Sequence, residues 1–364
     1  MNICLIGDSL TSLALAKNLI NKKIKVSLYH SKKKNIFKDR TLGISNDNFN
    51  FISKEILKIK RSLFWGIKKI EIFDEYKENK KILEFQKNNS ELFFMTKYNN
   101  IYTSLNFNLK KNKLFKKILI KHESFYEKIL NNSKFDLIIN CETNNKIYKD
   151  FFNKAFRKNY NSYAYTFIMN HNKIDNIKAS QIFTKFGPIA FLPISSTETS
   201  IVFSCNDKNI LLNQTKFEEI VRKYNDYYKI KNFKKFEKFK LNFSILRNYY
   251  YNKIMIFGDG LHKIHPLAGQ GFNMALRDIK ILSKIIDNRI DLGLELNHSI
   301  YDEFEKKMKH FNFIFASSID LIHEFFKLDN KFKKKYSARL FKTIGKNKIF
   351  NKIISEYADK GLVY

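Results

Sequence analysis

The segment GDGLHKIHPLAGQGFNMALRD, residues 258–278, gathers residue types that bind a ligand through the backbone. Four of the chain's 11 glycines and one of its 3 prolines lie close together here. They are Gly258, Gly260, Gly269, Gly271 and Pro266. Glycine lets the backbone approach a ligand closely, and a helix that begins after such a turn presents unpaired N–H groups at the positive end of its dipole. This chemistry suits a ligand oxygen that carries or develops negative charge.

Asp259 adds a carboxylate that can accept hydrogen bonds from sugar-like hydroxyls. The run KIMIFGD (253–259) predicts a buried strand that delivers Asp259 to the carboxyl edge of a parallel sheet, where open α/β folds bind ligands. A helix should follow, because Met274, Ile279 and Leu282 keep helical spacing. An ordinary glycine turn is the alternative, which the combination of four glycines, a proline and an aspartate disfavours.

The first thirty residues predict a βαβ unit that would lie beside this strand. NICLIG (2–7) is a short apolar run that ends in glycine, residues 8–23 keep helical spacing, and KIKVSLYH (23–30) is a second strand. FDLIINC (135–141) has the composition of another buried parallel strand.

A second region has an antiparallel character. GIKKIEIFDEY and KILEFQKN predict a strand pair, and several β-branched and aromatic runs follow between residues 163 and 206. We therefore expect an α/β fold: a Rossmann-like domain from residues 1–64, 91–150 and 253–325, an inserted and mainly antiparallel substrate domain from 65–90 and 151–252, and a basic, helical C-terminal segment at 326–364. The aromatic residues of the inserted domain could line a pocket or fill a core.

The formal net charge of +32 permits an anionic partner, either nucleic acid or a membrane surface. The lysines are scattered, which favours compositional bias, and no nucleic-acid-binding motif accompanies them. No apolar run approaches the roughly 20 residues of a membrane span, and the first residues lack a signal-peptide pattern. The three cysteines are isolated and indicate neither zinc nor disulfides. We expect a cytoplasmic protein, with peripheral contact at the inner face of the membrane as an open alternative.

Three segments resemble a known family. Residues 258–278 resemble the second flavin-binding motif of class A flavoprotein monooxygenases, and most closely that of the flavin-dependent aromatic hydroxylases of ubiquinone biosynthesis. RTLGISNDNFNFI (40–52) is similar to the family's arginine followed by an ALS segment, and FGPIAFLPIS (186–195) to its GPlAlLPl strand. The resemblance extends from residue 1 to about residue 330 and implies a fold like that of para-hydroxybenzoate hydroxylase.

The resemblance implies an FAD site. Asp259 would hold the ribityl chain, residues 269–271 would place the helix start against the flavin pyrimidine edge, Pro266 would lie near the ring, and Arg40 would contact the cofactor. The residues expected to bind FAD are Gly7, Ser9, Ser12, His30, Arg40, Asp259, Pro266, Gly269, Gln270 and Gly271.

The nucleotide end departs from the family pattern. The fingerprint G-x-G-x-x-G reads GDSLTS, so Gly7 is followed by Ser9 and Ser12 in the other two glycine positions. His30 stands where the acidic residue for the adenosine ribose is expected, and Glu142 substitutes for the aspartate of the family's ADG stretch. We expect His262 and His265 to pack or hydrogen-bond within their loop, and no metal site or protein general base is indicated.

By resemblance, the chain is an FAD-dependent monooxygenase that hydroxylates the aromatic ring of a polyprenylated phenol in ubiquinone biosynthesis. NAD(P)H or another reductant would reduce the flavin, O2 would add at C4a, and the hydroperoxide would deliver one oxygen to the ring. Two alternatives stay open: another class A flavoenzyme such as a halogenase or reductase, and a cofactor-poor scaffold that works with other ubiquinone-biosynthesis proteins. The ring position, tail length, electron donor and oligomeric state are not specified by these residues.

Overall fold

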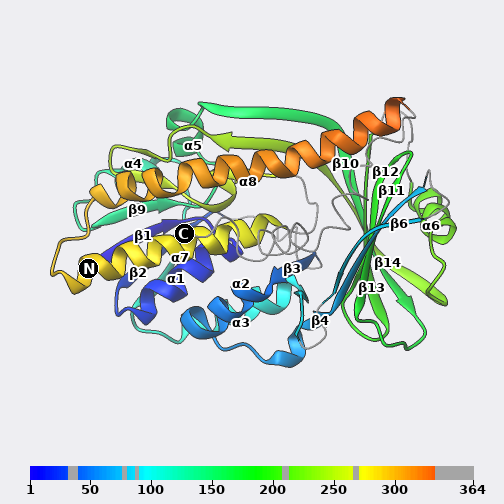
Figure 1. Cartoon of the computed structure of the whole chain (residues 1–364). Coiled ribbons are helices and arrows are strands. Elements are labelled where there is room, and N and C mark those ends of the chain that lie inside the picture. The colour runs from blue at the N-terminus through cyan, green and yellow to red at the C-terminus, as the bar shows by residue number, and fades with distance from the viewer. Residues whose placement is uncertain (32–39, 76–79, 87–89, 207–212, 265–269, 333–364) are drawn as a thin grey trace.

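The computed structural model describes residues 1–31, 40–75, 80–86, 90–206, 213–264 and 270–332 (Figure 1). The predicted roles of Pro266 and Gly269, and most of the C-terminal segment 326–364, therefore lie outside the described residues.

A six-stranded sheet lies at the centre of one half of the molecule. Its order is β15 (Tyr250–Tyr251), β16 (Ile254–Ile256), β9 (Leu137–Asn140), β1 (Asn2–Ile6), β2 (Lys25–His30) and β8 (Phe115–Leu119). All neighbours pair in parallel except β15, which pairs antiparallel with β16. The predicted strands at 2–7, 23–30, 135–141 and 253–259 are confirmed. β1, β9 and β16 are buried along almost their whole length, whereas β2 alternates between buried and partly exposed residues.

Helices cover this sheet. α1 (Leu10–Asn21) contacts α3 (Tyr98–Lys110) and α7 (Gln270–Asp291), and α7 contacts α8 (Ser299–Phe332). The short helices α4 (Ser124–Leu130) and α5 (Lys146–Phe151) complete this half (Figure 1). Because α1 is enclosed by the sheet and by two helices, ten of its residues are buried.

An eight-stranded sheet forms the second half. Its order is β17 (His262–Lys263), β14 (Ile230–Leu246), β10 (Ala155–His171), β13 (Glu198–Asn206), β12 (Gly187–Pro193), β11 (Lys178–Thr184), β5 (Lys69–Asp74) and β6 (Lys80–Gln86). Only β11 and β5 pair in parallel, so the expected antiparallel character is confirmed. Helix α6 (Gln214–Lys223) covers one face, where Phe167, Phe203 and Phe217 form a buried aromatic cluster.

A small sheet and one long helix join the halves. β3 (Thr41–Ser45), β7 (Phe93–Lys97) and β4 (Trp65–Ile67) form a three-stranded sheet, and α2 (Asn46–Phe51) follows β3 directly. α8 runs along both halves (Figure 1), and its Asp320 accepts hydrogen bonds from Lys158 and from the Tyr160 hydroxyl of β10. The six-stranded sheet and the eight-stranded sheet lie on either side of β3.

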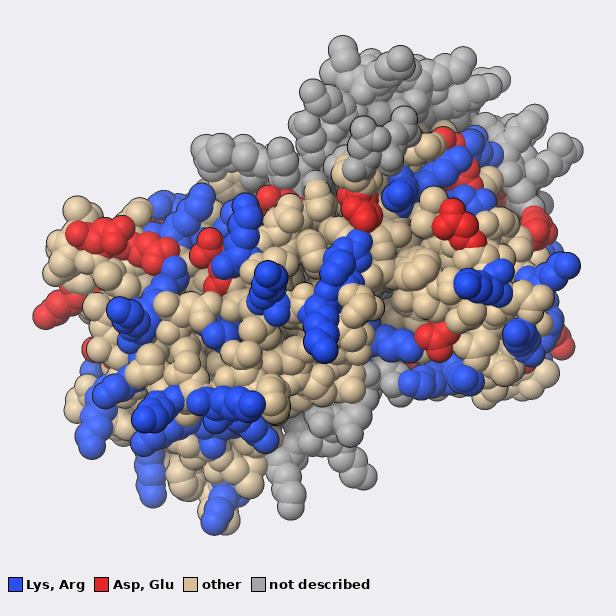
Figure 2. Space-filling model, turned by 90° about the horizontal axis from the view of Figure 1, so that it is seen from below, with Lys and Arg blue, Asp and Glu red and all other residues tan. Residues whose placement is uncertain are grey.

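Basic side chains are spread over the surface, and Figure 2 shows Lys and Arg over both halves of one face. Among the helices of the described ranges, none combines the length and the apolar character needed to cross a bilayer. The spread of Lys and Arg over the surface agrees with the scattered lysines of the sequence.

Two glycines allow the packing of the 258–278 segment to be tested. Gly258 has φ +64°, and a Cβ there would lie 2.7 Å from Cγ2 of Thr11 on α1. Gly293 has φ +67°, but a Cβ there would meet no described atom within 4 Å. We expect Gly293→Ala to lower the free energy of unfolding by about 1 kcal/mol through its left-handed backbone alone. Gly258→Ala should cost about 3 kcal/mol, because overpacking adds to the same backbone penalty.

Urea denaturation of both variants would measure this difference. Equal losses of stability would show that the turn does not pack tightly on α1.

Candidate functional site

Four of the singled-out residues lie at one edge of the six-stranded sheet. Gly7 follows β1, His30 ends β2, Glu142 follows β9, and Asp259 follows β16. These four strands are parallel neighbours, so their carboxyl ends meet. The structure thus brings together residues separated by up to 252 positions, from Gly7 to Asp259, at the edge where open α/β sheets bind ligands.

The turn after β1 is built from Gly7, Ser9 and Ser12. Gly7 has φ +110°, and a Cβ there would lie 3.2 Å from Cβ of Glu142, so glycine is required. The Ser9 hydroxyl accepts from the Ser12 backbone N–H at 3.2 Å, and the Ser12 hydroxyl accepts from the Ser9 backbone N–H at 2.8 Å. This reciprocal pair is a capping box. The two serines therefore satisfy the backbone N–H groups of Ser9 and Ser12 with each other's hydroxyls.

Asp8 is a site residue that sequence reasoning missed. Its Oδ2 accepts from the Tyr102 hydroxyl at 2.9 Å and from Lys117 Nζ at 2.8 Å. Its Oδ1 is buried and has no hydrogen-bond partner among the described residues. A buried acceptor without a donor is costly, and a ligand hydroxyl can supply that donor. The only sequence signal for Asp8 is its place directly after Gly7.

Tyr98, which the sequence reasoning also missed, links this edge to Arg40. Burial raises the pKa of the Tyr98 hydroxyl to about 12, and the charges of Asp8 and Asp259 add to the rise. Its backbone N–H donates to the carbonyl of Arg40 at 2.7 Å. Tyr98 is thus a neutral hydroxyl near two carboxylates at this edge.

The buried side chain of Asn273 joins two of the recognised segments. Its Oδ1 accepts from the Ser45 backbone N–H and from Asn48 Nδ2, each at 3.0 Å. Its Nδ2 donates to the Gly43 carbonyl at 2.9 Å. The start of α7 is thereby fixed against β3. A Cβ at Gly271 would meet no described atom within 4 Å, so space is open beside this helix start. Gln270 begins α7, but its side chain is not described.

His262 and Asp278 form a buried pair. Nε2 of His262 lies 2.6 Å from Oδ2 of Asp278, and both side chains are at most 1% exposed. Asn312 on α8 donates to Oδ1 of the same carboxylate at 3.0 Å. Burial alone would lower the pKa of His262, but the charge and hydrogen bond of Asp278 raise it overall. The partner of His262 therefore lies on α7, and not within the loop as the sequence suggested. His265 lies outside the described residues.

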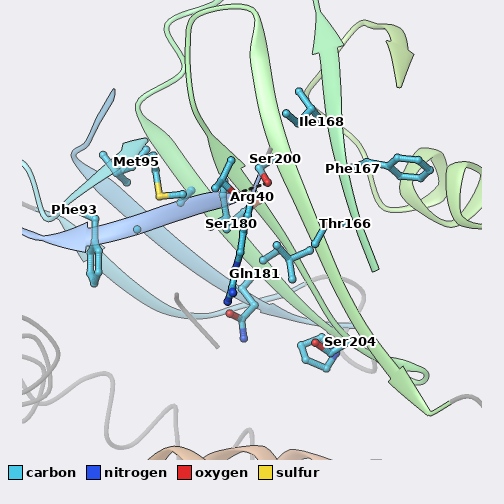
Figure 3. A pocket seen from close by; sticks show the side chains of 18 of the residues that line it. Arg40, Phe93, Met95, Thr166, Phe167, Ile168, Ser180, Gln181, Ser200 and Ser204 are labelled. Carbon is cyan, nitrogen blue, oxygen red and sulfur yellow. Dashed lines mark hydrogen bonds between the residues drawn. The ribbon is translucent and has the colours of Figure 1, made fainter. Parts of the chain in front are cut away.

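A cavity lies between β3 and the eight-stranded sheet (Figure 3). It has about 1230 Å³ of empty space, part of it open to solvent. Apolar side chains dominate its wall, including Ile67, Ile70, Phe93, Met95, Ala190, Leu192, Val202 and Phe239. Arg40 also lines it, with its guanidinium carbon 5.7 Å from the centroid of the Phe239 ring.

Most of the aromatic residues expected in either a pocket or a core belong to the core. Phe191 and Phe203, for example, are at most 2% exposed and pack in the cluster beneath α6.

The same fold occurs in solved FAD-dependent monooxygenases. The p-nitrophenol 4-monooxygenase PnpA of Pseudomonas putida has a TM-score of 0.73 at 10% identity, with 98% of this chain and 97% of that chain covered. A variant of HpxO from Klebsiella pneumoniae, solved in complex with FAD, has a TM-score of 0.71 at 10% identity, with 97% of each chain covered. At this identity the likeness shows the fold alone, a mixed α/β fold shared with these enzymes. The family model for squalene epoxidase matches residues 136–344, and the chain belongs to that family.

Curated relatives share parts of the sequence. The ubiquinone biosynthesis monooxygenase COQ6 of Caenorhabditis elegans is 26% identical over 217 residues, which cover 47% of this chain and 48% of the relative. The 3-demethoxyubiquinol 3-hydroxylase of Escherichia coli is 28% identical over 149 residues, covering 39% of this chain and 38% of the relative. The chain spans about half or less of the length of these relatives.

The buried pair predicts a pH dependence of stability. Because the folded-state pKa of His262 lies above its unfolded value of about 6.5, the pair contributes fully below that pH. This contribution is lost as the pH rises through the folded-state pKa. We expect His262→Asn to cost about 3 kcal/mol of unfolding free energy at pH 6, because Asp278 is left without its cation. The cost should shrink at higher pH.

Urea unfolding of both proteins between pH 5.5 and 9 checks this sign. A stability difference that grows with pH would contradict a protonated His262.

Proposed function

We propose that this protein is an FAD-dependent monooxygenase that hydroxylates the aromatic ring of a polyprenylated phenol in ubiquinone biosynthesis. The proposal rests on the position of the sheet edge next to the cavity. The sheet edge that bears Asp259 is connected, through Tyr98 and Arg40, to a mainly apolar cavity. The names of the relatives support the substrate class, and the family and fold support the oxidative chemistry.

The residues at this edge fit FAD at its ribityl and ring end. Asp259 and the partnerless Oδ1 of Asp8 are acceptors for ribityl hydroxyls. The start of α7 and the open space at Gly271 suit the pyrimidine edge, where N–H groups stabilise negative charge. Bound FAD would supply the electrons that activate O2 and the transfer of one oxygen to the ring, with NAD(P)H as the proposed electron donor.

The chain's own residues bind and enclose the substrate. The apolar wall of the cavity can take an aromatic ring and the first part of a prenyl tail, and it excludes water from the reacting carbon. The spread of Lys and Arg over the surface is compatible with peripheral contact at an anionic membrane (Figure 2), where a prenylated substrate would reside. Other proteins of the same biosynthesis are proposed partners.

One observation favours a second function. The capping box of Ser9 and Ser12 uses backbone N–H groups that a pyrophosphate could otherwise bind. A scaffold subunit that has lost its cofactor would have this feature, whereas the open space at Gly271 and the partnerless Asp8 oxygen favour the enzyme.

The first experiment is an absorption spectrum of the purified protein from about 300 to 550 nm, before and after FAD is added. Stoichiometric bound flavin is expected. Asp259→Ala should weaken FAD binding roughly 10-fold to 100-fold, because a hydrogen bond to a charged group is removed. Asp259→Asn should lose less, since its amide oxygen still accepts.

Asp150→Ala is the matched control, because Asp150 lies on α5 outside this edge and should leave affinity unchanged. A protein that takes up no flavin from excess FAD would contradict the monooxygenase and leave the scaffold.

A further inference from the structure

The backbone N–H groups at the start of α1 are bonded within the chain. The N–H of Ser9 donates to the Ser12 hydroxyl, and the N–H of Ser12 donates to the Ser9 hydroxyl. The N–H of Leu10 donates to the Tyr98 hydroxyl, and the N–H of Leu13 donates to the Ser9 carbonyl at 3.0 Å. Four of the five N–H groups from Ser9 to Leu13 therefore have partners in the protein. In a dinucleotide site, these are the groups that bind the pyrophosphate.

The Tyr98 side chain is fixed at the start of α1. Its backbone N–H donates to the Arg40 carbonyl at 2.7 Å, and its ring stacks on that of Tyr102 with the centroids 5.9 Å apart. Tyr102 is itself held, because its hydroxyl donates to Asp8 at 2.9 Å. A phosphate that approached the Leu10 N–H would therefore have to displace a side chain that is already packed and hydrogen-bonded.

The carboxylate of Glu142 lies across the turn that a pyrophosphate would approach. β1 lies between β9 and β2 in the sheet, and Glu142 follows β9 whereas Ser31 follows β2. The Ser31 hydroxyl nevertheless donates to Oε1 of Glu142 at 3.4 Å. The Glu142 side chain therefore extends over Gly7, where a Cβ would lie 3.2 Å from Cβ of Glu142. The space that glycine leaves at this turn is thus filled by a side chain of the protein.

The charge at this edge disfavours phosphate groups. The carboxylates of Asp8, Glu142 and Asp259 lie here, and Lys117 is bound to the first of them at 2.8 Å. Arg40 directs its guanidinium into the cavity beside β3 (Figure 3). The carboxylates would repel the negative charges of a pyrophosphate, whereas ribityl hydroxyls can donate hydrogen bonds to them.

We propose that this edge recognises the isoalloxazine ring and the ribityl chain of a flavin, and that the adenosine diphosphate half of FAD adds nothing to the affinity. The open space at Gly271 and the acceptor oxygens of Asp259 and Asp8 serve the ring and the ribityl chain. The occupied N–H groups of α1 and the Glu142 carboxylate act against the diphosphate. The ligand class is thus a flavin with or without its nucleotide. This inference rests on the proposed function, which brings a flavin to this edge.

Calorimetric titration of the flavin-free, full-length protein with riboflavin and with FAD tests the inference. We expect the two dissociation constants to lie within roughly 3-fold of each other. A working phosphate site would favour FAD by roughly 100-fold or more, because hydrogen bonds to a charged group are strong. A preference for FAD of more than roughly 10-fold would overturn the inference.

Glu142→Gln removes the charge that lies across the Gly7 turn and keeps the size of the side chain. It should strengthen FAD binding roughly 10-fold and leave the riboflavin affinity unchanged, since only FAD carries phosphate. Glu295→Gln is the matched control, because it changes the net charge equally and Glu295 follows the end of α7 that lies away from this edge. Thermal unfolding of each variant checks that it is folded. Equal effects of the two variants on FAD binding would contradict the role of Glu142.

The use of both flavins separates this inference from the proposed function. Tight binding of FAD with weak binding of riboflavin would leave the monooxygenase standing and remove the inference. If neither flavin binds, the proposed function is contradicted and the inference falls with it.

Discussion

The side chain of Asn273 is the contact on which the arrangement of the site depends. Fully buried, it satisfies two donors and one acceptor in the segment from Gly43 to Asn48, and so fixes the start of α7 against β3. β3 in turn lies between the six-stranded sheet and the cavity. Its residue Thr41 is hydrogen-bonded to Ser200, which fixes β3 to the eight-stranded sheet. The ligand edge and the cavity are therefore positioned relative to each other by one amide whose loss would leave several buried polar groups unpaired.

Charge divides the site into two parts. The sheet edge carries the carboxylates of Asp8, Glu142 and Asp259, with Lys117 bound to the first of them. The cavity has Arg40 and Lys235 against the single carboxylate of Glu237. Hydroxyl-rich ligand groups suit the first part, and groups that develop negative charge suit the second. Such a division lets one continuous site hold two chemically different molecules.

Much of the fold could be predicted from the sequence, because buried parallel strands and the helices after glycine turns have strong local patterns. The long strand β14 was not singled out. Its second half alternates at Phe239, Leu241, Phe243 and Ile245, but the left-handed backbone of Lys235 breaks the period in the lysine-rich first half. Gly7, His30, Glu142 and Asp259 were found because each ends or follows a recognisable strand, whereas Asp8 at the same edge was missed. Asn273 and Tyr98 were missed, since their roles arise from contacts with distant segments.

The capping box of Ser9 and Ser12 bears on how the protein folds before any ligand has bound. Because Ser9 and Ser12 satisfy each other's backbone N–H groups, this part of the helix start is ordered without a bound phosphate, so α1 and the sheet beneath it can form before any ligand binds. Ligand binding stabilises a fold only by the free energy that it adds to an existing native state. A chain built in this way can be folded before any ligand binds.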